Sequence, residues 1–170
     1  MDITMTLNPY LSIITLNVNR LNAPAKRYRV SEWIKQQDPS ICCLKEINFR
    51  PEDTFRLKVK GWRTIYRATG SQKKAGVAIL ISDKLDFKLK AATRDEEEHY
   101  IIITGSIHQE ELTIINVYVL NTGAHKYIKQ LITNISNLID KNVVIAGDFN
   151  TPLQQWIDHL DTGSIKKQGP

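Results

Sequence analysis

The runs LTIINVY at residues 112–118 and NVVIAGDFN at residues 142–150 decide both the fold and the place of a candidate site. Their apolar parts are rich in isoleucine and valine and almost uninterrupted, which indicates strands covered on both faces. Each run ends in polar residues where the strand would stop. The two runs therefore predict a buried sheet whose strand ends carry functional groups.

Similar apolar runs recur earlier in the chain, with turn-forming residues between them: LSIITL (11–16), SICCL (40–44), TIYRA (64–68), VAILIS (77–82) and YIIITGS (100–106). Helical periodicity appears twice, over residues 24–37 and 128–139. In the first helix Val30, Trp33 and Ile34 are expected to line one face. Strands and helices thus follow the order β-α-β, a run of strands, then α-β. This order predicts an α/β or α+β layered domain with a mixed sheet.

The composition is that of a folded globular chain, since 42% of the 170 residues are hydrophobic and 24% are charged. No apolar run approaches the ~20 residues of a membrane span, and the first residues lack a basic signal-peptide region. The adjacent Cys42 and Cys43 lie in an apolar run, so we expect buried thiols in a reducing compartment. We therefore expect an intracellular protein, nuclear or cytoplasmic, that is neither secreted nor membrane-bound.

The net charge of +5 is unevenly distributed. From Thr54 to Ser82 there are no acidic residues, and there are seven basic ones: Arg56, Lys58, Lys60, Arg63, Arg67, Lys73 and Lys74. Such a stretch suits a polyanion such as DNA, because lysine and arginine neutralise phosphates in a weak, sequence-independent manner. The alternative is a solvated basic face around two core aromatic residues, Trp62 and Tyr66.

Polar residues follow four of the apolar runs. Asn17 follows the run at 11–16 and Glu46 follows the run at 40–44. Tyr118 and Asn121 follow the apolar part of the run at 112–118, and Asp148 and Asn150 follow that of the run at 142–150. In layered α/β sheets the carboxyl ends of strands form the ligand-binding edge. Carboxylates and amides without Cys or His make a set of hard oxygen ligands, which suits Mg²⁺, with Mn²⁺ as a possible substitute. Each of these residues alone is also a common turn former.

The motifs LNVNRLN, CCLKE, KKAGVAILIS, LTIINVY and GDFNTPL, in this order, resemble the endonuclease domain of LINE retrotransposons. That domain belongs to the endonuclease/exonuclease/phosphatase superfamily with the DNase-I-like nucleases. The resemblance implies a four-layer α/β sandwich and a Mg²⁺-dependent DNA endonuclease. It identifies residues 11–153 as a partial domain, truncated after the GDFN strand, and residues 154–170 as a divergent tail.

The resemblance also implies roles for individual residues. The position of Glu46 holds Mg²⁺ with Asn17 nearby, and that of Asp148 orients or activates the attacking water. Asn150 matches a residue that contacts the scissile phosphate, and Tyr118 and Asn121 match phosphate-binding residues. With the basic stretch, this makes Asp148, Asn150 and Tyr118 the candidate catalytic residues. The candidate substrate-binding residues are Asn121, Arg56, Lys73 and Lys74.

The sequence departs from the family pattern at several positions. Lys45 and Asn48 replace the Gln and His of the family's Gln-Glu-Thr-His motif, Arg20 replaces a glycine, and Val119-Leu120 replaces Ala-Pro. The family's later Ser-Asp-His motif has no counterpart in this sequence, and His99, His108 and His125 are expected in loops or near a helix start. We therefore expect a partial endonuclease that is inactive as a single chain. The alternatives are a nucleic-acid-binding module without catalysis and a nuclease that another chain completes.

Overall fold

The structure, a computed structural model, describes residues 11–49, 56–68, 76–94, 99–118 and 142–148, together with residues 129–131, 133 and 135. For residues 65–68, 94 and 148 it describes the backbone alone. The main elements of this part are β1 (Ile13–Asn17), α2 (Pro24–Gln37), β2 (Ile41–Lys45), β3 (Trp62–Ala68), β4 (Val77–Ser82), β5 (Phe87–Arg94), β6 (Tyr100–Ile107), β7 (Glu110–Tyr118) and β8 (Asn142–Asp148).

The first sheet has the strand order β1-β2-β4-β3. Strands β1 and β2 run parallel, while β4 is antiparallel to both of its neighbours, β2 and β3. Every residue of β2 and β4 is buried, as their continuous apolar sequence predicts. By contrast β1, the strand at one edge of the sheet, alternates between half-buried and exposed residues, so the prediction of cover on both faces is wrong for it.

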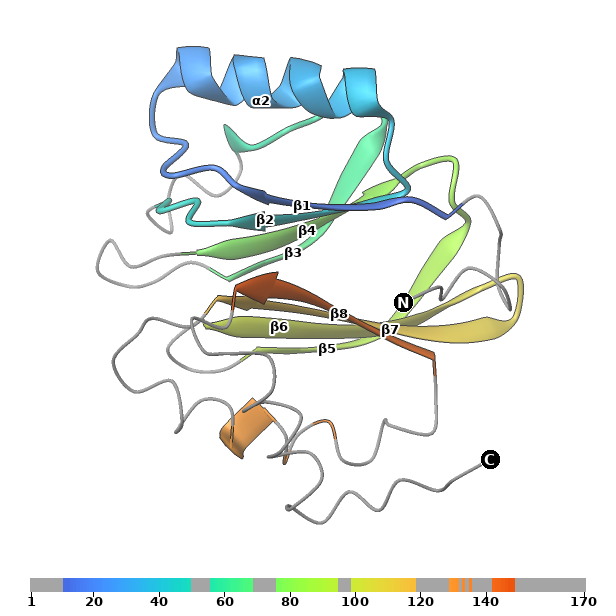
Figure 1. The fold of residues 1–170 in the computed structure, drawn as a ribbon. Helices are drawn as coiled ribbons and strands as arrows, with labels where there is room; N and C mark the ends of the chain where they lie inside the picture. Colours follow the sequence, from blue (N-terminus) through green and yellow to red (C-terminus); the bar gives the residue numbers. More distant parts are fainter. Residues whose placement is uncertain are drawn as a thin grey trace.

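Helix α2 covers the outer face of this first sheet (Figure 1). Pro24 occupies its first turn, and Asp38 ends it in a left-handed conformation (φ 48°) with its N–H bonded to the Ile34 carbonyl. Ile34 is fully buried against the sheet, Val30 is partly buried and Trp33 is 36% exposed, so the apolar face of the helix is covered only in part. No helix in the described ranges is long and apolar enough to span a membrane.

The second sheet has the strand order β5-β6-β7-β8, antiparallel except for the parallel pair β7 and β8. Strand β5, with the sequence FKLKAATR, was not among the predicted strands. It lies at an edge of the sheet, and Lys88 and Lys90 on it are exposed. Lysines are typical of sheet edges, because they discourage pairing with another chain, and they also mask the apolar pattern.

The two sheets pack face to face with a core between them (Figure 1). The helical residues 129–131, 133 and 135 lie on the outer side of the second sheet, where Leu131 and Ile135 are buried. The order of layers is therefore helix, sheet, sheet, helix. This arrangement confirms the predicted α/β sandwich.

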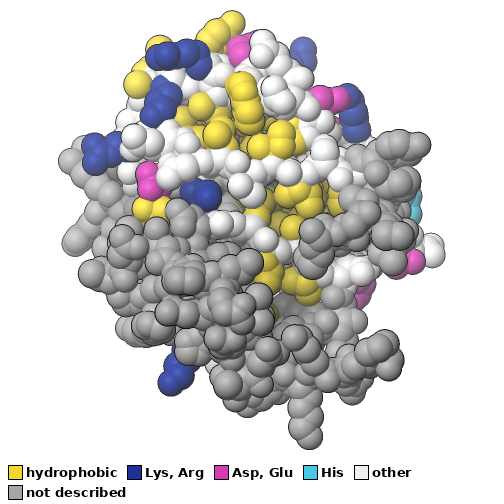
Figure 2. All heavy atoms as spheres, viewed as in Figure 1, with side chains coloured by type: hydrophobic (Ala, Val, Ile, Leu, Met, Phe, Trp, Pro, Cys, Tyr) yellow, Lys and Arg dark blue, Asp and Glu magenta, His cyan; other side chains and the backbone are white. Residues whose placement is uncertain are grey.

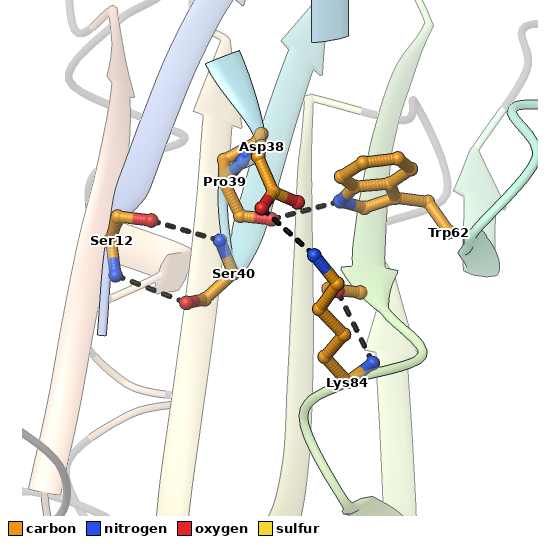
Figure 3. A network of polar contacts seen from close by, with 7 residues as sticks. Ser12, Asp38, Pro39, Ser40, Trp62 and Lys84 are labelled. Atoms are coloured by element: carbon orange, nitrogen blue, oxygen red, sulfur yellow. Dashed lines mark hydrogen bonds and ion pairs between the residues drawn. The ribbon is translucent and has the colours of Figure 1, made fainter. Parts of the chain in front are cut away.

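A polar network ties together the end of the first sheet at which β2 begins (Figure 3). Ser12 and Ser40 each donate a backbone N–H to the hydroxyl of the other, at 3.1 and 3.0 Å. The Trp62 indole donates to the Pro39 carbonyl at 2.9 Å. These contacts fix the start of β1, β2 and β3, and the candidate site lies at the other end of β1 and β2.

Candidate active site

The first half of the candidate site is the paired carboxyl ends of β1 and β2. In the parallel register Asn17 lies beside Lys45, and Glu46 follows directly. The pairing continues beyond the strands, since the N–H groups of Val18 and Arg20 donate to the Lys45 and Glu46 carbonyls at 3.0 and 2.6 Å. The predicted convergence of Asn17 and Glu46 is therefore present in the fold.

The backbone at these strand ends is unusual. Four non-glycine residues have a left-handed conformation: Asn19 (φ 44°), Arg20 (φ 70°), Glu46 (φ 56°) and Asn48 (φ 53°). The Asn17 carbonyl oxygen Oδ1 accepts the Asn19 N–H at 3.0 Å, which supports the first of these turns. Such conformations cost free energy and collect at functional sites. Arg20, which stands where the family pattern has a glycine, adopts a conformation that a glycine would take without strain.

The second half of the site is the end of the parallel pair β7 and β8, where Tyr118 lies opposite Asp148. Gly147, directly before Asp148, has φ 146°, a conformation available in practice only to glycine. A Cβ atom at this position would collide with the backbone carbonyl of Val117. The glycine therefore allows the two strand ends to approach each other.

Asn116 holds the two halves together. It is completely buried in β7, and its Nδ2 donates across the sandwich to the carbonyls of Leu44 at 3.0 Å and Ala78 at 3.1 Å. Leu44 and Ala78 are paired residues of β2 and β4, and Leu44 lies two positions before Glu46. Since Tyr118 lies two positions after Asn116, the bridge places both pairs of strand ends at the same edge of the sandwich.

His99, which was expected in a loop, lies in a bend directly before β6 at this edge. His99 is buried directly before β6, and its carbonyl accepts the Tyr118 N–H at 2.6 Å. Its burial beside the end of β7 is a feature that the sequence did not signal.

The remaining predicted site residues are only partly described. Asn121, Asn150, Lys73 and Lys74 lie outside the described residues, and Asp148 is placed by its backbone alone. Arg56 is exposed, on the segment that leads into β3. The fold thus brings together Asn17, Glu46, Tyr118 and position 148 from the predicted set.

The donors at this edge fit the divalent cation that the sequence predicts. Glu46 supplies a carboxylate and Asn17 an amide oxygen, while the buried Oδ1 of Asn48 has no hydrogen-bond partner. Mg²⁺ is commonly held by one or two carboxylates, with water and substrate oxygens completing its shell. Groups of three or more His, Cys, Asp or Glu side chains do not occur among the described residues.

A basic groove lies away from this edge, between α2 and the segment leading into β3. It has a volume of about 490 Å³, and its polar and aromatic lining includes Lys35, Lys58, Lys60 and Trp62. Lys35 pairs with Glu32 at 2.9 Å, whereas no described residue forms an ion pair with Lys58 or Lys60. The groove is lined in part by residues of the acid-free stretch from Thr54 to Ser82.

A second, more apolar groove of about 590 Å³ runs along the β1 edge and is lined by Leu16, Lys26, Arg29, Val30 and Trp33. Figure 2 shows apolar side chains reaching the surface on the face that carries α2 and β1. In the described part of the chain, β1 and β8 each pair with one strand only. The side of the sandwich next to the candidate site therefore has free strand edges within those residues.

Comparison of the sequence with known families matches residues 14–164 to the endonuclease/exonuclease/phosphatase family. The chain is also 26% identical over 148 residues to the Transposon TX1 uncharacterized 149 kDa protein of Xenopus laevis. That match covers 84% of this chain but 11% of the transposon protein. The chain thus spans a small part of the relative's length.

Comparison of the fold gives solved structures of the same architecture. Truncated TDP2 from Caenorhabditis elegans matches with a TM-score of 0.65 and 18% identity, over 85% of this chain and 64% of that one. An AP endonuclease from Archaeoglobus fulgidus matches with a TM-score of 0.61 and 20% identity, over 83% and 58%. TDP2 from D. rerio, solved in complex with a single-strand DNA product, matches with a TM-score of 0.60 and 18% identity, over 84% and 61%. This chain covers less than two thirds of each of them.

Proposed function

The chain belongs to the endonuclease/exonuclease/phosphatase family, and on that premise we propose that it is a retrotransposon-derived part of a Mg²⁺-dependent DNA endonuclease domain. Its target is the phosphodiester bond. One observation carries the proposal: Asn17 and Glu46 on one sheet and Tyr118 and position 148 on the other meet at one edge, joined by the Asn116 bridge.

The residues at this edge have separate roles in hydrolysis. Glu46 and Asn17 would hold the metal, which would polarise a phosphoryl oxygen and stabilise the leaving oxyanion. Asp148 orients the attacking water and accepts its proton. Three residues bind oxygens of the scissile phosphate, namely Tyr118, Asn121 and Asn150. The basic residues Arg56, Lys73 and Lys74 bind the flanking DNA.

We propose further that this chain alone has little or no nicking activity. Lys45 puts a positive charge beside Glu46, where it opposes a divalent cation. Asn48 stands where the family has a histidine. Loss of a single preorganised electrostatic partner typically costs ~10²–10³-fold in rate.

Relaxation of supercoiled plasmid in Mg²⁺ tests both statements. We expect the unmodified chain to nick no faster than its Glu46→Ala variant. Fusion to a family-type C-terminal half should produce nicking, with a further increase when Lys45→Gln and Asn48→His are added, and Glu46→Ala should abolish it. If the unmodified chain nicks plasmid and Glu46→Ala or Asp148→Ala removes that activity, inactivity is wrong and the assigned site is right. If the fusion nicks equally well with Glu46→Ala, the assigned metal site is wrong.

A second candidate function, nucleic-acid binding without catalysis, is favoured by the basic groove. Its lysines suit phosphates, and the indole of Trp62 is a surface on which a base can stack. DNA affinity should then fall steeply with salt, and Lys58→Gln with Lys60→Gln should flatten that dependence. Neutralising Arg67, Lys73 and Lys74 together tests the rest of the stretch. A slope that neither set changes would exclude this stretch as the footprint.

A third candidate, a nuclease completed by another chain, is favoured by the free edges of β1 and β8 within the described residues. Mixing this chain with a separately expressed C-terminal half of a family member should then restore Mg²⁺-dependent nicking. The same mixture made with Glu46→Ala should remain inactive. Nicking that occurs with the added half alone would remove the support for this candidate.

A further inference from the structure

Lys45, which the family pattern has as glutamine, is a largely buried residue at the candidate site. It is the last residue of β2 and only 8% exposed. Cys43 and Ile41, two and four positions earlier, belong to the core between the two sheets. Because successive side chains of a strand alternate between its faces, Lys45 also lies on the face toward the second sheet.

The neighbours of Lys45 on this face are the residues of the candidate site. Asn17 is beside it in the parallel register of β1 and β2. Across the sandwich, β2 packs against β7 and β8. Asn116 of β7 bonds to the carbonyl of Leu44, the residue directly before Lys45, and Tyr118 lies farther along β7 toward the open edge. The ammonium group therefore belongs to the mouth of the sandwich and not to its outer surface.

Lys45 takes part in no ion pair within the described part of the chain. The ion pairs there join Lys35 to Glu32, Lys84 to Asp38 and Lys90 to Glu111, and none includes Lys45. The nearby Oδ1 of Asn116 has no hydrogen-bond partner, so Lys45 does not donate to it either. The Nζ atom of Lys45 is not among the buried polar atoms that lack a partner, so the ammonium group reaches solvent at this edge, where an anion can contact it.

We propose that Lys45 binds a phosphate oxygen of nucleic acid at the strand-end site, so that this chain holds the phosphodiester there without a divalent cation. The proposal rests on the proposed function in one respect, namely that the substrate phosphate enters at this edge. A fixed ammonium attracts a phosphate and repels Mg²⁺ or Mn²⁺ for the same electrostatic reason. Lys45 therefore has opposite effects on the two ligands.

These opposite effects define the experiment. Binding of a short, fluorescently labelled single-stranded oligonucleotide is measured by anisotropy in EDTA, and Mn²⁺ binding without DNA is measured from the free-ion electron paramagnetic resonance signal. We expect Lys45→Gln to weaken oligonucleotide binding by about tenfold or more, as the loss of a charge-assisted hydrogen bond implies. The same variant should bind Mn²⁺ more tightly than the unmodified chain. Lys45→Arg, which keeps the charge, should retain most of the oligonucleotide affinity.

Lys88→Gln is the matched control, because it removes the same charge from an exposed position on β5. It should change oligonucleotide affinity far less than Lys45→Gln at equal salt. Added oligonucleotide should also raise the melting temperature of the unmodified chain but not that of Lys45→Gln, so a misfolded variant is recognised by its melt. Equal affinity of Lys45→Gln and the unmodified chain in EDTA would overturn the proposal.

Glu46→Ala separates this proposal from the proposed function. In EDTA it should bind the oligonucleotide at least as well as the unmodified chain, since a negative charge near the phosphate has been removed. In Mn²⁺ it should lose metal binding. Absence of Mn²⁺ binding in every variant would count against the proposed metal site, while the comparison of Lys45 with Gln in EDTA would still decide the role of Lys45.

Discussion

Replacing the bridging residue Asn116 by leucine, which is larger and apolar, should destabilise the fold less than replacing it by aspartate, which has nearly the same shape. Its Nδ2 makes two hydrogen bonds, each worth ~1 kcal/mol net, to carbonyls of the paired residues Leu44 and Ala78. Its Oδ1 is buried without a partner, which already costs ~1–3 kcal/mol. In Asn116→Leu the loss of the two bonds and the relief of the unpartnered oxygen nearly cancel. We expect the free energy of unfolding to change by less than about 1 kcal/mol.

Asn116→Asp preserves the shape of the side chain but replaces its hydrogen-bond donor by an acceptor. An ionised carboxylate cannot donate to either carbonyl, and it places a buried charge in the core, so we expect a loss of ~3 kcal/mol or more at neutral pH. Burial raises the pKa of such a carboxyl above its unfolded value of ~4. The loss should therefore be small below that pH and grow as the pH rises through the folded-state pKa.

Urea unfolding followed by circular dichroism at several pH values measures the free energy of unfolding of each variant. Asn116→Ala is the reference, and it also creates a cavity. We expect the alanine variant to lose ~2 kcal/mol, between the other two. If Asn116→Asp is as stable as Asn116→Leu at neutral pH, the bridge between the sheets does not exist as described.

Three further predictions follow from the same region of the fold. Gly147→Ala should destabilise the chain by more than ~3 kcal/mol in urea unfolding, because its Cβ would collide with the Val117 carbonyl; a near-normal melt would contradict this. Burial raises the pKa of both Cys42 and Cys43 to about 12, so neither thiol should react with a disulfide reagent at pH 8 until denaturant is added. Because the thiols ionise near 9.0 when unfolded, stability should fall as pH rises above that value. Arg20→Gly should raise stability by up to ~1 kcal/mol by relieving the left-handed conformation, and a lower melting temperature would show that the arginine side chain contributes more than its backbone costs.

The sequence predicted most of the fold because the central strands are apolar on both faces. Strands β2, β4, β6 and β7 stand out for this reason, and Pro24 marks the start of α2. Strand β5 was not predicted, because an edge strand with Lys88 and Lys90 on its exposed face has too weak an apolar pattern. Trp33 shows that helical spacing identifies the residues of one face but not how deeply each is buried, since it remains 36% exposed.

For the site, sequence reasoning identified the strand ends but not how the sheets face each other. That Asn17 and Glu46 share an edge follows from parallel pairing, which alternating strands and helices predict. The bridge from Asn116 to Leu44 and the inward position of Lys45 depend on the register of one sheet against another. That register is set by packing across the core between residues 38 or more positions apart, and no local pattern encodes it.

The pairing of strand ends has a consequence for the order of folding. Each half of the site joins two strands linked by one connection, Asn17 with Lys45 and Tyr118 with Asp148, so each half can form before the sheets dock. Contacts between distant segments form later, because their loop closure costs more entropy. The site would then be the last part to assemble and the first to be lost. In native-state hydrogen exchange we expect the interior of β4 and β7 to stay protected when the amides of Val18 and Arg20 have already opened.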